Sequence, residues 1–122
     1  MNAEILKQTA ARLVAKGKGI IAADESAGTC QKRFDSVGVE CAEENRRQYR
    51  QLIVTAPALD QYGSGIILFD ETIRQKDDSG KPFAEILAAK GVLPGIKVDA
   101  GAKDLALHPG EHVTEGLDKL RE

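Results

Sequence analysis

The sequence predicts an α/β protein with a parallel β-sheet, and three apolar stretches lead to this prediction. Residues 19–23, 64–69 and 95–98 are short apolar runs that begin at or next to a glycine. Such runs, bounded by turn residues, are typical of buried strands. Helical patterns over residues 43–56 and 83–90 separate them. Because a strand–helix–strand–helix–strand order implies crossover connections, the strands should run parallel.

The loop after the first strand distinguishes two kinds of parallel sheet. It carries neither the glycine-rich dinucleotide fingerprint nor a P-loop, which favours a (β/α)8 barrel over a nucleotide-binding doubly wound sheet. A closed barrel needs eight strands and typically ~250 residues. The chain has 122 residues. We therefore expect residues 1–122 to be the N-terminal part, about three strands, of a single (β/α)8 TIM-barrel domain, with no second domain.

Composition narrows the class of protein. The chain is 42% hydrophobic and 30% charged with a net charge of −2, which is ordinary for a globular domain and predicts no nucleic-acid or anionic-membrane partner. It shows no apolar run of ~18–20 residues and no signal peptide. Its two cysteines lack CxxC spacing and form no zinc pattern with the two histidines. These features predict a reduced, intracellular location.

The segments at the two ends of the chain have different patterns. Residues 3–16 read as an amphipathic helix that ends at Gly17, with Ile5, Leu6, Leu13 and Val14 as its apolar face. Residues 99–112 are expected to be irregular, and a last helix is expected to begin after Thr114.

The longest helix is predicted over residues 43–56, after a loop over residues 24–42 with at most a helical turn at 31–36. Acidic residues in its first turn suit the helix dipole, and Glu43 can pair with Arg47. The expected buried stripe is Tyr49, Leu52, Ile53 and Ala56, and the helix should stop before Pro57.

A long loop is predicted over residues 70–81, ending in a turn at residues 77–80. Pro82 is well placed to start the next helix, over residues 83–90, and Gly91 to end it. The residues expected to pack inward from this helix are Phe83, Ile86 and Leu87.

Two consecutive carboxylates follow the first predicted strand. Asp24 lies at a carboxyl end, where α/β proteins build their sites, and Glu25 should point the opposite way. Asp24 is either a general acid or base or a cap of the following turn. Acids at the other strand ends (Asp70, Glu71, Asp99) raise the possibility of a metal site. A lysine at the same edge, Lys97, argues against a metal there.

Hydroxyl and basic side chains follow these acids. Ser26, Gly28 and Thr29 form a loop that could cradle an anion, and Lys32 and Arg33 come a few residues later. Basic side chains beside hydroxyls fit a phosphate. The alternative is that the two cations are solvated surface charges.

Lys97 is the most unusual residue of the chain. It is predicted inside an apolar strand, on the face opposite to Ile96 and Val98. A lysine at such a position needs an anionic partner. From the residues alone three interpretations stay open: a Schiff-base nucleophile, a phosphate-binding cation, or a purely stabilising ion pair with Asp24 or Asp99.

Several stretches, in order along the chain, closely resemble class I fructose-bisphosphate aldolase, the animal, plant and cyanobacterial type. They are residues 17–26 (GKGIIAADES), 43–52 (EENRRQYRQL), 65–72 (GIILFDET) and 95–99 (GIKVD), followed by a segment over residues 110–118. The resemblance implies a (β/α)8 barrel that reversibly cleaves fructose 1,6-bisphosphate to dihydroxyacetone phosphate and glyceraldehyde 3-phosphate. It further implies a lysine Schiff base, no metal and no other cofactor.

The resemblance also assigns roles to residues. Asp24 matches the acid that handles the proton of the C4 hydroxyl during carbon–carbon cleavage. Lys97 matches a lysine that contacts the substrate and its phosphate and that is not the Schiff-base lysine. Ser26 and Thr29 match hydroxyls near a substrate phosphate, the second being serine in many relatives. Arg33 matches a basic residue at the same end.

Other positions depart from the family pattern. Ala100 stands where some relatives carry lysine, and Asp70 where they carry histidine or glutamate. The family's Schiff-base lysine and its later catalytic glutamate match nothing before Glu122, so the 122-residue chain is expected to be inactive alone. The alternatives are a non-catalytic barrel fragment with residual phosphate binding or chain association, and a distinct lyase that uses Lys97 itself.

The resemblance finally implies partners and a location. The expected partner is a phosphorylated sugar, with neither nucleic acid nor membrane, and the full-length protein is expected to be a homo-oligomer, a tetramer in the family. The expected location is the cytoplasm, or a plastid in a photosynthetic eukaryote, although no transit peptide is visible.

Overall fold

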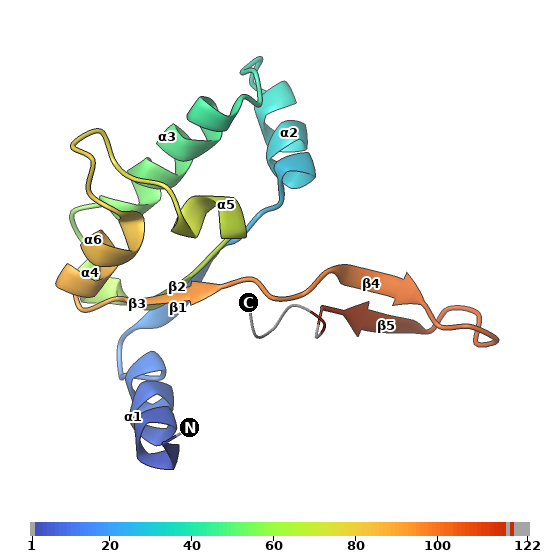
Figure 1. Ribbon diagram of the computed structural model, residues 1–122, viewed down its shortest axis with the longest axis horizontal. Helices are drawn as coiled ribbons and strands as arrows, with labels where there is room; N and C mark the ends of the chain where they lie inside the picture. The colour runs from blue at the N-terminus through green and yellow to red at the C-terminus, as the bar shows by residue number, and fades with distance from the viewer. Residues whose placement is uncertain (1, 117, 119–122) are drawn as a thin grey trace.

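The computed structural model describes residues 2–116 and residue 118. Its main sheet has three parallel strands, β1 (Gly19–Ala23), β2 (Gly63–Leu68) and β3 (Leu93–Ile96), which pair in the order β1-β2-β3 (Figure 1). Parallel neighbours need helical crossovers, and these lie between consecutive strands. The predicted parallel sheet is therefore confirmed.

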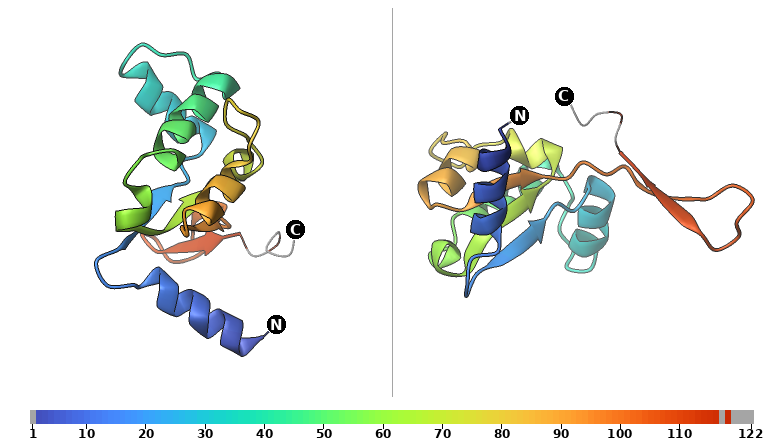
Figure 2. Two further views of the ribbon diagram at one scale, coloured as in Figure 1. Left: turned by 90° about the vertical axis from the view of Figure 1, so that its left-hand side faces the viewer. Right: turned by 90° about the horizontal axis from the view of Figure 1, so that it is seen from below.

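Helices precede the first strand and occupy most of the chain between the strands of the main sheet (Figure 2). They are α1 (Ala3–Leu13), α2 (Ala27–Asp35), α3 (Glu43–Val54), α4 (Leu59–Tyr62), α5 (Asp70–Ile73) and α6 (Phe83–Ala89). One face of the sheet carries the core, whose fully buried members include Ala23, Ile66, Leu68, Phe83 and Leu87. Because side chains alternate along a strand, the opposite face is open, and Ile20 is 50% exposed there.

The prediction of a loop over residues 24–42 was wrong, because α2 occupies nine of these residues. Cys30 and Phe34 lie four residues apart and are both buried, which gives the helix an apolar stripe. The Phe34 ring packs edge-on against Tyr49 of α3, with ring centroids 5.6 Å apart. Burial of this short stripe against α3 stabilises a helix whose own sequence signal is weak.

The position of α3 agrees with the prediction, but its buried face differs. Arg50 and Val54 are the buried residues, whereas Leu52, expected inside, is 74% exposed. Ile53 and Ala56 are half-buried against the core, as expected. The helix is thus rotated so that an arginine, one turn before Val54, faces the protein interior.

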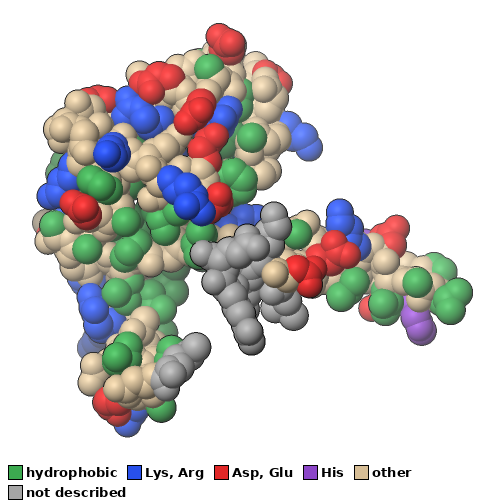
Figure 3. Space-filling view, viewed as in Figure 1, with side chains coloured by type: hydrophobic (Ala, Val, Ile, Leu, Met, Phe, Trp, Pro, Cys, Tyr) green, Lys and Arg blue, Asp and Glu red, His purple; other side chains and the backbone are tan. Residues whose placement is uncertain are grey.

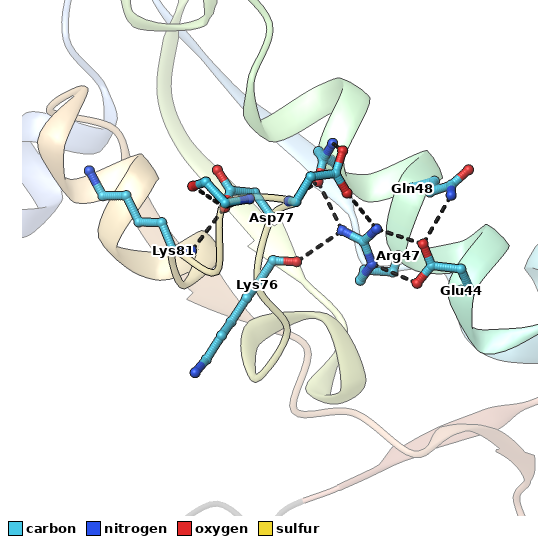
Figure 4. Close-up of polar contacts among 9 residues, drawn as sticks. Glu44, Arg47, Gln48, Lys76, Asp77 and Lys81 are labelled. Atoms are coloured by element: carbon cyan, nitrogen blue, oxygen red, sulfur yellow. Dashed lines mark hydrogen bonds and ion pairs between the residues drawn. The ribbon is translucent and has the colours of Figure 1, made fainter.

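The predicted pairing of Glu43 with Arg47 does not occur. Arg47 pairs instead with Glu44, at 2.6 Å, and with Asp78 of the following loop, at 2.7 Å. It also donates to the Lys76 carbonyl at 3.0 Å, as Figure 4 shows. Arg47 therefore ties the loop after α5 to α3.

This loop was predicted to be irregular over residues 70–81, but its first four residues form α5. The turn predicted at residues 77–80 is present. The Asp77 carboxylate accepts hydrogen bonds from the backbone N–H groups of Ser79 and Lys81, at 2.9 and 2.8 Å (Figure 4). Gly80 has φ 84°, a conformation that glycine adopts without strain.

The sixth helix closely follows the prediction. Pro82 directly precedes α6, and Gly91 follows it with φ 72°. The predicted inward residues, Phe83, Ile86 and Leu87, are all buried. Here the local signals and the packing agree.

The end of the chain differs most from the prediction. The third strand covers residues 93–96 rather than 95–98, and residues 99–112, expected to be irregular, contain β4 (Gly101–Asp104). This strand pairs antiparallel with β5 (His112–Glu115) in a hairpin that extends away from the main sheet (Figure 1). The hairpin has little apolar periodicity because nearly all its residues are exposed. A helix was predicted to begin after Thr114, but Glu115 belongs to β5, so this start is wrong. Most of the residues that follow lie outside the described part of the chain.

The first helix is confirmed, but none of its residues is buried. The apolar side chains of Ile5, Leu6 and Val14 are exposed, and Figure 3 shows hydrophobic groups at the surface of this part of the molecule. Its link to the sheet is Ser64, whose hydroxyl donates to the Leu13 carbonyl at 2.6 Å. No helix in the described part of the chain combines the length and the apolar character needed to cross a bilayer.

Gly63, at the start of β2, provides a test of the packing between α4 and the sheet. A Cβ at this position would lie 2.7 Å from the Leu59 carbonyl oxygen, which is backbone. Because backbone cannot move aside cheaply, we expect Gly63→Ala to lower the free energy of unfolding by about 1–3 kcal/mol. Denaturant unfolding followed by circular dichroism measures this change.

Gly19→Ala, at the start of the neighbouring strand, is the matched control. A Cβ there meets nothing within 4 Å, so the stability should stay close to that of the wild type. Equal effects of the two substitutions would contradict the packing described for α4.

Candidate active site

The register of the sheet brings three residues to one edge. Ala23 pairs with Leu68, and Leu68 with Ile96. The Lys97 N–H donates to the Leu68 carbonyl at 2.9 Å, so the ladder continues one residue further. The next residue of each strand therefore falls in a common row, formed by Asp24, Phe69 and Lys97. Because Ala23 and Leu68 face the helices, this row faces the open side of the sheet.

Lys97 is held between two carboxylates. Its ammonium lies 3.6 Å from Asp24 Oδ2 and makes a closer contact with Asp99. The side chains of Lys97 and Asp24 are each 26% exposed. The hydrogen bond that Lys97 donates to Asp99 raises the pKa of Lys97 above its usual value, and Asp24 contributes to the same shift. Lys97 is therefore a cation at neutral pH.

An open cavity of about 470 Å³ lies over this row. It brings together four of the five residues predicted for the site: Asp24, Ser26, Thr29 and Lys97. Ser26 immediately precedes α2, and its Oγ lies 3.3 Å from Thr29 Oγ1. Carboxylate, ammonium and two hydroxyls thus share one cavity, a set that can bind a polyol phosphate and move a proton.

Arg33, the fifth predicted residue, does not line the cavity. It lies in the last turn of α2, pairs with Glu25 and donates to the Tyr49 hydroxyl at 3.2 Å. Its side chain is 55% exposed. Lys32, beside it, is exposed as well.

Glu25 also lines the cavity, and its carboxylate forms ion pairs with Arg50 and Arg33. Burial acts to raise the pKa of Glu25, but a backbone hydrogen bond and the charges of Arg50 and Arg33 outweigh it, so the pKa lies below its ordinary value. Sequence reasoning missed Arg50. The available signal was its place four residues before Val54, on the side of the helix that faces the sheet.

Of the acids at the other strand ends, Asp99 meets Asp24 at Lys97, whereas Asp70 and Glu71 lie outside the cavity. Asp70 pairs with Arg74 at 2.8 Å, and Glu71 with Arg46 at 2.6 Å. Among residues 2–116 and 118, no group of three or more histidine, cysteine or acidic residues is arranged to hold a metal ion. Both cysteines are free thiols.

Comparison with known proteins decides the family. The family model described as fructose-bisphosphate aldolase class-I matches residues 5–122. The chain belongs to the class I fructose-bisphosphate aldolase family. This confirms the resemblance drawn from the sequence motifs.

Individual members of this family are similar in sequence to nearly the whole chain. A probable fructose-bisphosphate aldolase class 1 of Xanthomonas axonopodis pv. citri is 63% identical over 99% of the chain, which covers 36% of that protein. Fructose-bisphosphate aldolase 1 of Toxoplasma gondii is 52% identical over 98% of the chain and 33% of its own length. The chain thus spans about a third of the length of the relatives it matches.

A solved aldolase structure shows the same fold. It is the fructose-bisphosphate aldolase of Plasmodium falciparum, crystallised in complex with TRAP and a small-molecule inhibitor. The TM-score is 0.89 at 42% identity, and the match covers 97% of this chain and 35% of the other. The three parallel strands therefore correspond to part of an aldolase barrel, as predicted.

The ion pair between Glu25 and Arg50 makes the stability of this aldolase domain depend on pH. Because the native pKa of Glu25 lies below its ordinary value of 4.5, its contribution is complete above pH 4.5 and is lost as the pH falls through the native pKa. Glu25→Gln leaves the buried Arg50 without its carboxylate partner. We expect it to lower the free energy of unfolding by up to about 3–5 kcal/mol near pH 7.

Urea unfolding of both proteins between pH 7 and pH 3 measures this dependence. The difference between wild type and variant should shrink below pH 4.5, because wild-type Glu25 then becomes protonated as well. A difference that stays constant over this range would show that the charge of Glu25 is not what stabilises the fold.

Proposed function

We propose that residues 1–122 form the first three strands, and one wall of the active site, of a class I fructose-bisphosphate aldolase. The reaction is the reversible cleavage of fructose 1,6-bisphosphate to dihydroxyacetone phosphate and glyceraldehyde 3-phosphate. The observation that supports this function best is the approach of Asp24 and Lys97 at the carboxyl edge of the sheet, in a cavity that also contains Ser26 and Thr29.

Asp24 is assigned to proton transfer. When the bond between C3 and C4 breaks, the C4 hydroxyl loses its proton to the carboxylate and becomes the aldehyde oxygen. The electrons of the broken bond move toward C2, where an iminium formed by a lysine of a later strand accepts them. Asp24 lies at a strand end beside a cation, a suitable place for this exchange.

Lys97 is assigned to binding the substrate and its phosphate. A Schiff-base nucleophile must lose its proton to attack a carbonyl, but the contact with Asp99 raises the pKa of Lys97. A permanent ammonium instead suits substrate oxyanions and neutralises Asp24. This argument disfavours the alternative in which Lys97 itself forms the Schiff base.

The hydroxyls of Ser26 and Thr29 are assigned to a phosphate of the substrate. Ser26 directly precedes α2 and Thr29 lies in its first turn, where backbone N–H groups and the helix dipole favour an anion. Arg33 adds positive charge from the last turn of the same helix. We further propose that the full-length protein is a cytoplasmic homo-oligomer, a tetramer by family.

Replacement of Asp24 tests its role. In the full-length protein we expect Asp24→Ala to lower kcat for cleavage of fructose 1,6-bisphosphate by about 10²–10⁴-fold, the usual contribution of a general acid or base. Asp70→Ala is the matched control, since Asp70 follows the next strand but pairs with Arg74 outside the cavity. It should retain nearly full activity, and near-normal turnover by Asp24→Ala would rule out the assignment.

Borohydride trapping with dihydroxyacetone phosphate separates the three interpretations of the chain. The full-length protein should form a covalent adduct, and Lys97→Met should still form it, as should the control Lys103→Met on β4. The 122-residue chain should form none. Loss of the adduct in Lys97→Met alone would support Lys97 as the Schiff-base residue, and its absence in the full-length protein would contradict aldolase activity.

A further inference from the structure

We propose that Arg50 is a positioning residue of this active site: its guanidinium holds the turn between β1 and α2 and thereby sets the positions of Asp24 and Ser26. The inference rests on the proposed function, because it assigns Arg50 a part in the same reaction. Arg50 itself lies on α3, outside the cavity, and acts through Glu25.

The first observation is the burial of a charge. Arg50 is 2% exposed and is the largest fully buried side chain among the described residues. Burying a guanidinium is costly unless it is paired, and an apolar side chain of similar volume often gives equal or greater stability. A buried arginine at this place is therefore poorly explained by stability alone.

The second observation is where its donors point. Nη1 pairs with the Glu25 carboxylate, and Nη2 donates to the Glu25 backbone carbonyl at 2.8 Å. One guanidinium thus holds both the side chain and the main chain of the residue between Asp24 and Ser26. This carbonyl belongs to the peptide that joins Glu25 to Ser26. Arg50, on α3, therefore fixes the orientation of that peptide.

A third contact joins the Arg50 guanidinium to α2. Arg50 Nη2 lies 3.6 Å from the Sγ of Cys30, and that thiol is directed at the Glu25 carbonyl at 3.8 Å. Cys30 is buried in the first turns of α2, immediately after Thr29. The guanidinium therefore touches both the end of the strand that carries Asp24 and the helix that carries Thr29.

The guanidinium is itself held in place. It stacks over the Tyr49 ring, with its central carbon 5.1 Å from the ring centroid. The Tyr49 hydroxyl accepts a hydrogen bond from Arg33, which pairs with the second oxygen of the Glu25 carboxylate. Glu25 is thus fixed from two sides, and the planar fork of Arg50 is the part of this arrangement that a lysine, with its single ammonium, cannot reproduce.

The test compares two arginines of one helix in the full-length protein. Arg46, one turn earlier, has a similar fork: it holds both oxygens of Glu71, at 2.8 and 2.6 Å, and the Cys41 carbonyl at 2.6 Å. None of its partners lines the cavity. Arg46→Lys is therefore the control for Arg50→Lys, since both variants keep the charge and lose the fork.

We expect Arg50→Lys to lower kcat for fructose 1,6-bisphosphate cleavage by about 10- to 100-fold, as displaced catalytic groups do. Arg46→Lys should stay within about twofold of the wild type. Each variant is assayed at a temperature at which circular dichroism shows it fully folded. The borohydride adduct with dihydroxyacetone phosphate should be unchanged in both, because the trapping lysine lies on another strand.

Glu25→Asp provides a second variant should Arg50→Lys not fold. It keeps the charge but shortens the side chain, so the fork can no longer hold the carboxylate and the carbonyl together. We expect a similar fall in kcat with the adduct retained, and no further fall when the two substitutions are combined, since residues of one network act non-additively.

The outcomes separate this inference from the proposed function. A full-length wild type that neither traps the ketose phosphate nor cleaves the bisphosphate overturns both. An active wild type in which Arg50→Lys and Arg46→Lys lower kcat equally, or in which the effects of Arg50→Lys and Glu25→Asp are additive, overturns the positioning role alone.

Discussion

The alternation of side chains at the end of β1 is the constraint on which the site depends. Asp24 and Glu25 are consecutive residues directly after β1, and the alternation of the strand carried on by one residue turns them to opposite sides. Asp24 turns to the open face and meets Lys97, whereas Glu25 turns to the helices and meets Arg50. A shift of one residue in the register would exchange the two carboxylates and dismantle both pairs.

Each of these pairs places a cation against a carboxylate that directly follows β1. Lys97 lies at the cavity and remains partly accessible, as a group that contacts a substrate must. Arg50 is completely enclosed and joins elements that are distant in the sequence. Arg50 thus stabilises the turn between β1 and α2 from the side of the helices. On the opposite side of the turn, Asp24 shares one cavity with the hydroxyls of Ser26 and Thr29.

Strong local patterns made much of the fold predictable. The strand over residues 19–23 was predicted at its observed bounds, and α6 nearly so, because apolar runs, Pro82 and Gly91 all agree there. The hairpin of β4 and β5 was missed, since its strands are exposed and owe their pairing to each other rather than to a core. The second helix was missed because its stripe is only Cys30 and Phe34, which gain their partner on α3.

The sequence by itself determined the family, the parallel order of the strands and the identity of four residues that meet in the cavity, because motifs and periodicity are local properties of the chain. Only the tertiary structure decided which groups pair. It joined Lys97 to Asp24 and Asp99, kept Arg33 on Glu25, and buried Arg50 in place of Leu52. The rotation of a helix about its axis is set by the charges and volumes it packs against, and these come from strands far away in the sequence.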